Sequence, residues 1–256
     1  MTYWSRLYNI KPMGIGSGNV ESMTSYLARL AEAHSQATLG SLISYEIAPK
    51  LQKEYLTKST LFGGSRFYEN SSGLLGTGMI ANDIVKTMET LTGRDDLESL
   101  TFLPWGEVLG PRKLIRHTRA WCPVCLSRWK EENAEVYEPL RWSLQILQTC
   151  LVHRVELCTV CPRCSQENFL ISRKSRVGYC NKCGCWLGTD CGAKIGPNTG
   201  WDCWVADNVS NLVSTLPSKT ETFCYSDMIS DVINVHFGGS QKAFAAMRWG
   251  SPSRHA

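Results

Sequence analysis

Four pairs of potential metal ligands lie between positions 122 and 183 of this 256-residue chain. In each pair, two residues separate two cysteines or a cysteine and a histidine. The eight residues are Cys122, Cys125, Cys150, His153, Cys161, Cys164, Cys180 and Cys183. A structural zinc ion takes four thiolate or imidazole ligands, and one C-x2-C turn supplies two of them. The pattern therefore predicts two structural zinc ions.

The spacing between the pairs indicates which of them share an ion. Fifteen residues separate the last two pairs, which gives the C-x2-C-x15-C-x2-C spacing of a zinc ribbon. The first two pairs then form the other site, and the segment 150–164 joins both sites. Cys158 and Cys185 are close enough in sequence to compete for the second site. The cysteines outside the two sets are Cys158, Cys185, Cys191, Cys203 and Cys224, which we interpret as buried or free thiols.

Both ligand sets are complete, which favours structural over catalytic zinc. A catalytic zinc ion normally keeps three protein ligands and one open position. The chain has five histidines and no H-E-x-x-H, G-x-S-x-G or Walker lysine motif. A redox role would need one C-x2-C pair rather than four pairs in ordered succession. We expect no catalytic residues and no enzymatic activity.

The basic residues concentrate in the same region as the cysteines. The whole chain carries a net charge of +4, and residues 111–182 contain 13 Lys and Arg against 6 Asp and Glu. Two basic runs are candidates for contacts with DNA phosphates. They comprise Arg112, Lys113, Arg116 and Arg119 before the first pair, and Arg173, Lys174 and Arg176 within the second site. Partner binding and a solvated basic face are the alternatives.

Helical patterning predicts the elements that position these residues. Apolar residues at three- and four-residue steps predict a helix that begins at Asn19, with further helices near 39–56, 79–91 and 95–102. Residues 63–78 are predicted to be loop. Pro139 predicts a helix start inside the zinc region. The apolar face of this predicted helix would comprise Leu140, Leu144, Leu147 and Leu151.

The predicted fold class is α+β and zinc-stabilised. We expect an extended N-terminal tail (1–18), a helical helix-turn-helix-like subdomain (19–111), two consecutive zinc-ribbon or zinc-knuckle modules (112–157 and 158–203) and a helical segment (204–256). The last segment has an apolar stripe at 228–237 and reads as the start of a C-terminal helix-turn-helix. No apolar run is long enough for a membrane span, and no signal peptide is apparent. Twelve cysteines without a secretory signal indicate a reducing compartment.

The N-terminal stretch "TYWSRLY" gathers Tyr3, Trp4, Leu7 and Tyr8. Exposed aromatic residues on a tail are typical anchors in a partner's pocket. Docking on the chain's own domain is the alternative.

Two stretches resemble the TniQ/TnsD family. "KPMGIGSGNVESMTSYLARLAEAH" is similar to its N-terminal signature, and "RAWCPVCL…YEPLRWSLQILQTCLVHRVELCTVCPRC" to its cysteine-rich core. The resemblance covers about residues 7 to 187 and implies the eight metal ligands named above. It also implies a non-catalytic target-site selector of heteromeric DNA transposons, including CRISPR-associated ones.

By resemblance, such a protein connects double-stranded DNA or an RNA-guided effector complex to the AAA+ ATPase TnsC, which engages the transposase. A cytoplasmic, nucleoid-associated location in a bacterium would follow. A stand-alone zinc-ribbon DNA-binding transcription regulator is the main alternative, and a zinc hydrolase or nuclease is another.

Overall fold

The computed structural model describes residues 5–34, 38–51, 65–110, 112–189 and 200–215, together with residues 230 and 234. The chain divides into two compact units, residues 1–216 and 217–256, and the description below concerns the first. Apart from residues 230 and 234, the predicted C-terminal stripe and helix-turn-helix start lie outside the described residues, as do Tyr3 and Trp4.

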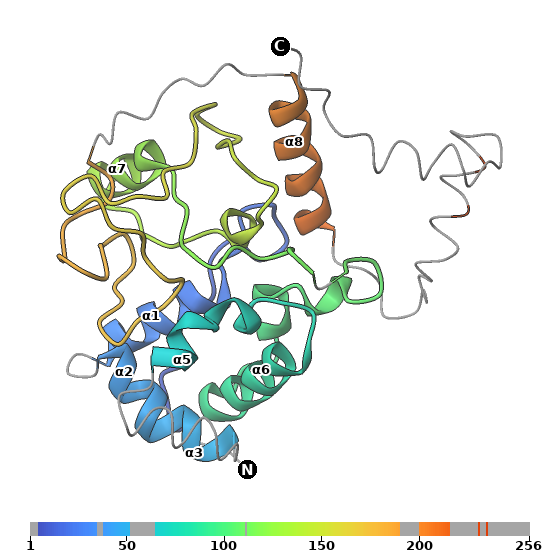
Figure 1. Cartoon of the computed structure of the whole chain (residues 1–256). Coiled ribbons are helices and arrows are strands. Elements are labelled where there is room, and N and C mark those ends of the chain that lie inside the picture. The colour runs from blue at the N-terminus through green and yellow to red at the C-terminus, as the bar shows by residue number, and fades with distance from the viewer. Residues whose placement is uncertain are drawn as a thin grey trace. The chain divides into compact units, whose positions relative to one another are not determined.

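The N-terminal part of the first unit is helical (Figure 1). Its α-helices are α1 (Met23–Ala33), α2 (Leu39–Leu42), α3 (Ala48–Leu51), α5 (Ser65–Glu69) and α6 (Met79–Thr92). A π-helical segment, η1 (Ile43–Ile47), joins α2 to α3, so residues 39–51 are helical throughout. The described residues of this part also form three 3-10 helices: η2 (Ser71–Leu74), η3 (Leu97–Leu100) and η4 (Leu103–Trp105).

Most of the helices predicted here are confirmed, with shifted boundaries. α6 matches the predicted helix at 79–91, and residues 97–100 form a 3-10 helix instead of an α-helix. The first helix begins at Met23 rather than Asn19, because the Ser22 hydroxyl caps it by accepting the N–H of Ser25. The predicted loop at 63–78 was wrong in part, since it contains α5 and η2.

The cysteine-rich part consists mainly of loops. Its helices are α7 (Pro123–Glu131) and a 3-10 turn, η5 (Leu140–Ser143), and α8 (Gly200–Ser214) follows. Within the described ranges the antiparallel pairing consists of isolated bridges such as Thr118–Phe169 and Trp121–Cys158. The structure is thus helical with little sheet, and it does not support the α+β class or continuous ribbon strands.

The helix predicted to start at Pro139 was wrong. Only one 3-10 turn forms, and Leu144 then adopts an extended conformation and pairs with Ile115. The Arg116 guanidinium donates hydrogen bonds to the carbonyls of Leu144 and Leu147. Tertiary contacts therefore use the backbone carbonyls that a continued helix would need for its own hydrogen bonds. Three of the four leucines predicted for the apolar face, Leu140, Leu144 and Leu147, are nevertheless buried.

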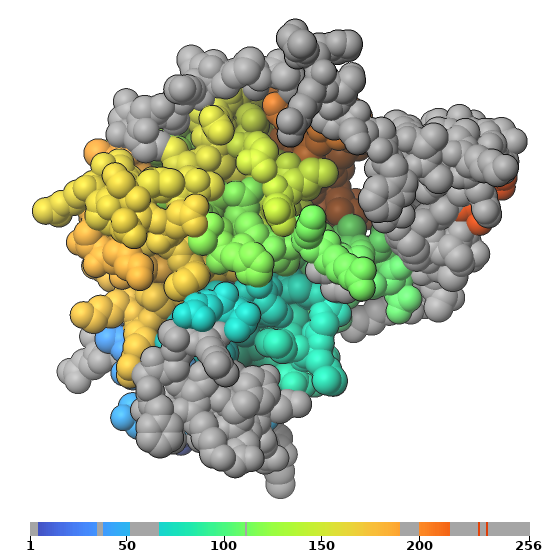
Figure 2. All heavy atoms as spheres, viewed as in Figure 1, coloured from blue at the N-terminus to red at the C-terminus, as the bar shows by residue number. Residues whose placement is uncertain are grey.

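One hydrophobic core joins the helices to the cysteine-rich loops. It includes Tyr26 on α1 and Trp105 on η4, together with Trp121 and Trp142 from the cysteine-rich part, each at most 2 % exposed. The described parts accordingly pack closely in the space-filling view (Figure 2). No helix of the described part is both long and apolar enough to cross a membrane.

α8 packs against η5, and its residue Ser210 contacts Gly18 in the loop before α1. A Cβ atom at Gly18 would lie 2.1 Å from the Ser210 hydroxyl oxygen and 2.7 Å from the Ser210 carbonyl oxygen, so only glycine fits this contact. The loop that contains the "GIGSGN" stretch is in this way held against α8.

Candidate metal centres

The first cluster combines the N-terminus of α7 with a turn. Cys122 is the N-cap residue of α7, and its Sγ accepts the Cys125 N–H at 3.4 Å. Pro123 follows at a helix-start position and is the sequence signal for α7, a helix that was not among the predicted elements. Cys150 and His153 come from the turn, and the four ligand atoms lie within 4.8 Å of one another.

The second cluster combines two turns. It brings together the Sγ atoms of Cys161, Cys164, Cys180 and Cys183, again within 4.8 Å of one another. In this set Cys161 Sγ lies 3.7 Å from Cys183 Sγ, and Cys164 Sγ lies 3.8 Å from Cys180 Sγ. The structure thus groups the eight residues into the two sets expected from their spacing.

The distances within both clusters fit a zinc ion. Tetrahedral coordination with zinc–sulfur bonds of about 2.3 Å places the sulfur atoms about 3.8 Å apart. In the first cluster, Cys125 Sγ lies 3.7 Å from Cys150 Sγ and 3.2 Å from His153 Nδ1. The donor sets, three thiols with one imidazole and four thiols, are also those of structural zinc sites. Both clusters could therefore hold zinc.

Three of the four ligand pairs share one backbone conformation. In each, the residue after the second ligand has a positive φ: 53° at Arg154, 54° at Ser165 and 69° at Gly184. The N–H of that residue donates to the carbonyl of the first ligand at 2.9–3.0 Å. One antiparallel bridge closes each turn: Thr149–Glu156, Val160–Glu167 and Tyr179–Trp186. We call these three turns knuckles; the Cys122/Cys125 pair instead uses the start of a helix.

Close packing of thiols shifts their protonation in the first cluster. Hydrogen bonds with Cys122 and Cys150, together with burial, raise the pKa of Cys125 above its usual range. Hydrogen bonds with Cys122 and Cys125 lower the pKa of Cys150. Such a site favours partial protonation, and a divalent cation would allow all three thiols to ionise.

A buried arginine lies close to the first cluster. Arg141 is 2 % exposed, and its Nη1 atom makes long hydrogen bonds to the Gly18 carbonyl (3.3 Å) and the Ser210 hydroxyl (3.4 Å). Its Nε atom has no hydrogen-bond partner. Burial lowers the pKa of Arg141, whereas the charges of Cys150 and Cys125 raise it. Sequence reasoning missed this residue because nothing in its local pattern marks it as buried.

The seven predicted DNA-contact residues fall into two groups. Arg112, Lys113, Arg173, Lys174 and Arg176 are exposed. Arg119 is 3 % exposed, forms an ion pair with Glu138 and donates to the Tyr179 carbonyl at 2.8 Å. Arg116 donates to backbone carbonyls, as described above. Both arginines thus have hydrogen-bond partners inside the fold, and their contact with a phosphate backbone stays a prediction.

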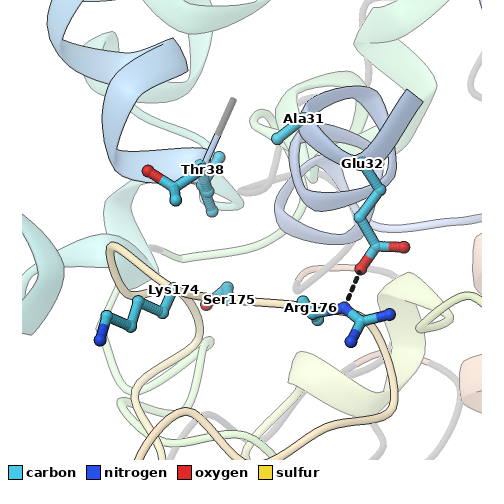
Figure 3. A pocket seen from close by; sticks show the side chains of 7 residues that line it. Ala31, Glu32, Thr38, Lys174, Ser175 and Arg176 are labelled. Carbon is cyan, nitrogen blue, oxygen red and sulfur yellow. Dashed lines mark hydrogen bonds and ion pairs between the residues drawn. The ribbon is translucent and has the colours of Figure 1, made fainter. Parts of the chain in front are cut away.

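Three of these exposed residues, Lys113, Lys174 and Arg176, line two cavities of about 500 Å³ each. Lys174 and Arg176 border the first, opposite Ala31 of α1 and Thr38, and Arg176 Nε lies 3.2 Å from Glu32 Oε1 (Figure 3). The Gly40 N–H donates to the Arg173 carbonyl at 2.9 Å, which attaches this basic loop to α2. Lys113 borders the second cavity beside the start of α6.

The structure separates the two described residues of the N-terminal aromatic group. Leu7 is 4 % exposed and its N–H donates to the Leu91 carbonyl at 2.8 Å, so it belongs to the chain's own core. Tyr8 is 57 % exposed and stacks on His34 with ring centroids 4.1 Å apart. Of these two, only Tyr8 offers a large side-chain surface to a partner.

Comparison with known proteins identifies the family. The family model described as TniQ matches residues 12–157, more than half of the chain. The chain belongs to the TniQ family. The TniQ match spans α1, α6 and the first cluster, and it indicates a role associated with DNA transposition. A search of curated proteins finds no match to this TniQ-family chain.

Proposed function

We propose that this chain is a non-enzymatic adaptor for target-site selection in transposition. It would connect a DNA target, or an RNA-guided effector complex, to the AAA+ ATPase TnsC and thereby recruit the transposase. The observation that carries the proposal is the TniQ match across residues 12–157. The complete ligand sets of both clusters support a scaffold rather than a catalyst, because a catalytic zinc ion keeps an open position.

The two clusters would each bind one structural zinc ion. Zinc binding would contribute directly to folding, because the cysteine-rich part consists of loops with few regular elements. Elemental analysis of the purified full chain should give two zinc ions per molecule. A value of zero or one would contradict this part of the proposal.

DNA would contact the exposed basic residues. Arg173, Lys174 and Arg176 lie on one loop beside a cavity, and together with Arg112 and Lys113 they offer positive charge without a buried ion pair. Each phosphate contact releases counterions and steepens the salt dependence of binding. We expect Lys174→Ala to weaken duplex binding and reduce the salt slope by about one unit. Lys86→Ala, at an exposed lysine on α6, is the matched control and should leave both unchanged.

The contact with TnsC would use the N-terminal aromatic residues. The test is co-sedimentation of the full chain with TnsC assembled on duplex DNA in the presence of a non-hydrolysable ATP analogue. Because Leu7 is part of the core, the variants are deletion of residues 1–4 and Tyr8→Ala, rather than a longer deletion. Trp201→Ala, at an aromatic residue that is 63 % exposed on α8, serves as the control.

Each outcome has a defined meaning. Capture of the wild-type chain and the control, but not of the N-terminal variants, supports the adaptor role and the proposed contact. Capture of every variant keeps the adaptor role and rejects the N-terminal contact. Failure of the wild-type chain to sediment with TnsC, combined with tight binding to DNA alone, would favour a zinc-ribbon DNA-binding regulator.

A further inference from the structure

The second cluster contains a fifth thiol within reach. Cys185 Sγ lies 3.3 Å from Cys161 Sγ, while Cys183 Sγ lies 3.7 Å from the same atom. Both residues belong to one knuckle and flank Gly184. Two neighbouring thiols of one turn therefore face the same sulfur of the opposite turn.

The backbone of this knuckle explains how both thiols approach the cluster. Gly184 has a φ of 69°, which reverses the chain between the two cysteines. The Cys180 N–H donates to the Cys185 carbonyl at 2.9 Å, which holds Cys185 at the closing position of the turn. In the two other knuckles the corresponding residues are Val155 and Gln166. The fifth thiol is thus particular to this knuckle among the three.

The two thiols differ in their exposure. Cys183 is exposed, whereas Cys185 is half-buried and packs against the hydrophobic core. A bond between a metal ion and Cys183 would be open to water on its outer side, while Cys185 approaches from the protein side. Zinc has no geometric preference from d-electrons, so it accepts any four thiolates that form a tetrahedron.

We propose that Cys183 and Cys185 are interchangeable fourth ligands of the second zinc ion, with Cys161, Cys164 and Cys180 as the three fixed ligands. In each exchange the incoming thiol loses its proton as its zinc–sulfur bond forms. The outgoing thiolate takes up a proton as its own bond breaks. The charge of the site is unchanged and no oxidant or reductant is needed. The 3.3 Å separation between the Cys185 and Cys161 sulfurs is below the tetrahedral edge of about 3.8 Å, so the two sulfurs are close enough to bind the same ion.

The first test is zinc stoichiometry in cysteine variants of the full chain. The wild-type chain must hold two zinc ions; if it holds fewer, this inference fails together with the proposed zinc sites. Cys183→Ser and Cys185→Ser should each still hold two, and the double variant should hold one. Cys164→Ser, which removes a fixed ligand, is the control and should also hold one.

Two results of this test would overturn the interchange. One is a Cys183→Ser chain that holds one zinc ion while its circular dichroism matches the wild type. The other is a double variant that still holds two. Neither result bears on recruitment by TnsC, so a failure here is distinct from a failure of the proposed adaptor function.

The second test uses the wild-type chain and does not depend on whether a variant folds. The zinc-loaded chain is treated briefly with limiting N-ethylmaleimide, and adducts are located by fragmentation mass spectrometry. Interchange predicts single adducts divided between Cys183 and Cys185, because whichever thiol is unbound reacts and leaves the other as the ligand. Adducts on only one of these two cysteines would show a fixed ligand set and overturn the proposal.

Discussion

At the scale of single residues, Arg141 shows how a charge can be buried beside a metal cluster. A buried guanidinium is costly unless an anion compensates for it. A zinc ion with three thiolates and one neutral imidazole carries one net negative charge, which matches the charge of Arg141. The arginine also contacts Gly18 and Ser210, so it connects the first cluster to the loop before α1 and to α8.

We expect Arg141→Met to weaken zinc binding at the first cluster, because the variant lacks the compensating charge. Loss of a group that supports the ligands typically reduces metal affinity by about 10–100-fold. Competition with a chelator of known affinity measures the effect. Arg128→Met is the control, since Arg128 lies on α7 near the same cluster but its side chain is 60 % exposed. Equal affinities in wild type and Arg141→Met would contradict this role.

Glu21 gives the fold a pH dependence. Its carboxylate is fully buried, accepts from the Ser25 hydroxyl at 2.8 Å and pairs with Arg29 at 2.6 Å. Burial outweighs the attraction of Arg29 and raises the pKa of Glu21 from 4.5 to about 6. The folded chain therefore binds this proton more tightly than the unfolded chain does.

The stability that the protonated Glu21 contributes is fully present below pH 4.5 and is lost as the pH rises through about 6. Over this range the free energy of unfolding of the wild type should fall by about 2 kcal/mol relative to Glu21→Gln, which has no proton to lose there. Urea unfolding of both chains at several pH values measures the difference. A constant difference between pH 4.5 and 7 would show that Glu21 does not titrate in this window.

At the scale of elements, the three knuckles depend on one left-handed residue each. Glycine occupies this position in one knuckle, while Ser165 and Arg154 occupy it in the others despite a cost of about 1–2 kcal/mol for a residue with a Cβ. The hydrogen bond from the N–H of this residue to the carbonyl of the first ligand closes the turn and offsets this cost.

Reciprocal substitutions test this cost. Ser165→Gly should raise the free energy of unfolding by about 1 kcal/mol, because glycine adopts a positive φ without strain. Gly184→Ala should lower it by a similar amount; a Cβ atom there meets nothing within 4 Å, so the change reports on the backbone alone. Thermal unfolding of the zinc-loaded chain is the measurement. Ala134→Gly is the comparison variant, because Ala134 is exposed and has no positive φ. Glycine relieves no strain there and adds freedom to the unfolded chain, so this variant should lower the free energy of unfolding.

At the scale of the whole molecule, the second cluster is joined to the rest of the fold by specific contacts. The Trp121 indole N–H donates to the Leu187 carbonyl at 3.0 Å, and the basic loop bonds to α2 through Arg173. Loss of the second zinc ion should therefore disturb these two contacts, and with them the position of the basic loop against α2.

We expect Cys161→Ser to unfold the second cluster and abolish recruitment to the TnsC–DNA filament, because the fixed ligand is lost and the basic loop is released. Hydrogen exchange should increase within residues 158–189 and around α2, while α6 keeps its protection. Co-sedimentation measures recruitment in parallel. A Cys161→Ser chain that shows wild-type hydrogen exchange and still sediments with the TnsC–DNA filament would contradict the proposal that the second cluster supports recruitment.

The sequence by itself determined the eight candidate ligands, their division into two sets and the long helices α1 and α6. These features are local, because ligand spacing and apolar periodicity are properties of short segments. Only the tertiary structure decided that the leucines after Pro139 form bridges and turns, that Arg116 and Arg119 point into the fold, and that Leu7 belongs to the core. Each of these depends on a partner distant in sequence, such as Leu144 for Arg116, Glu138 for Arg119 or Leu91 for Leu7. The approach of Cys185 to Cys161 is of the same kind, since it depends on how two knuckles face each other.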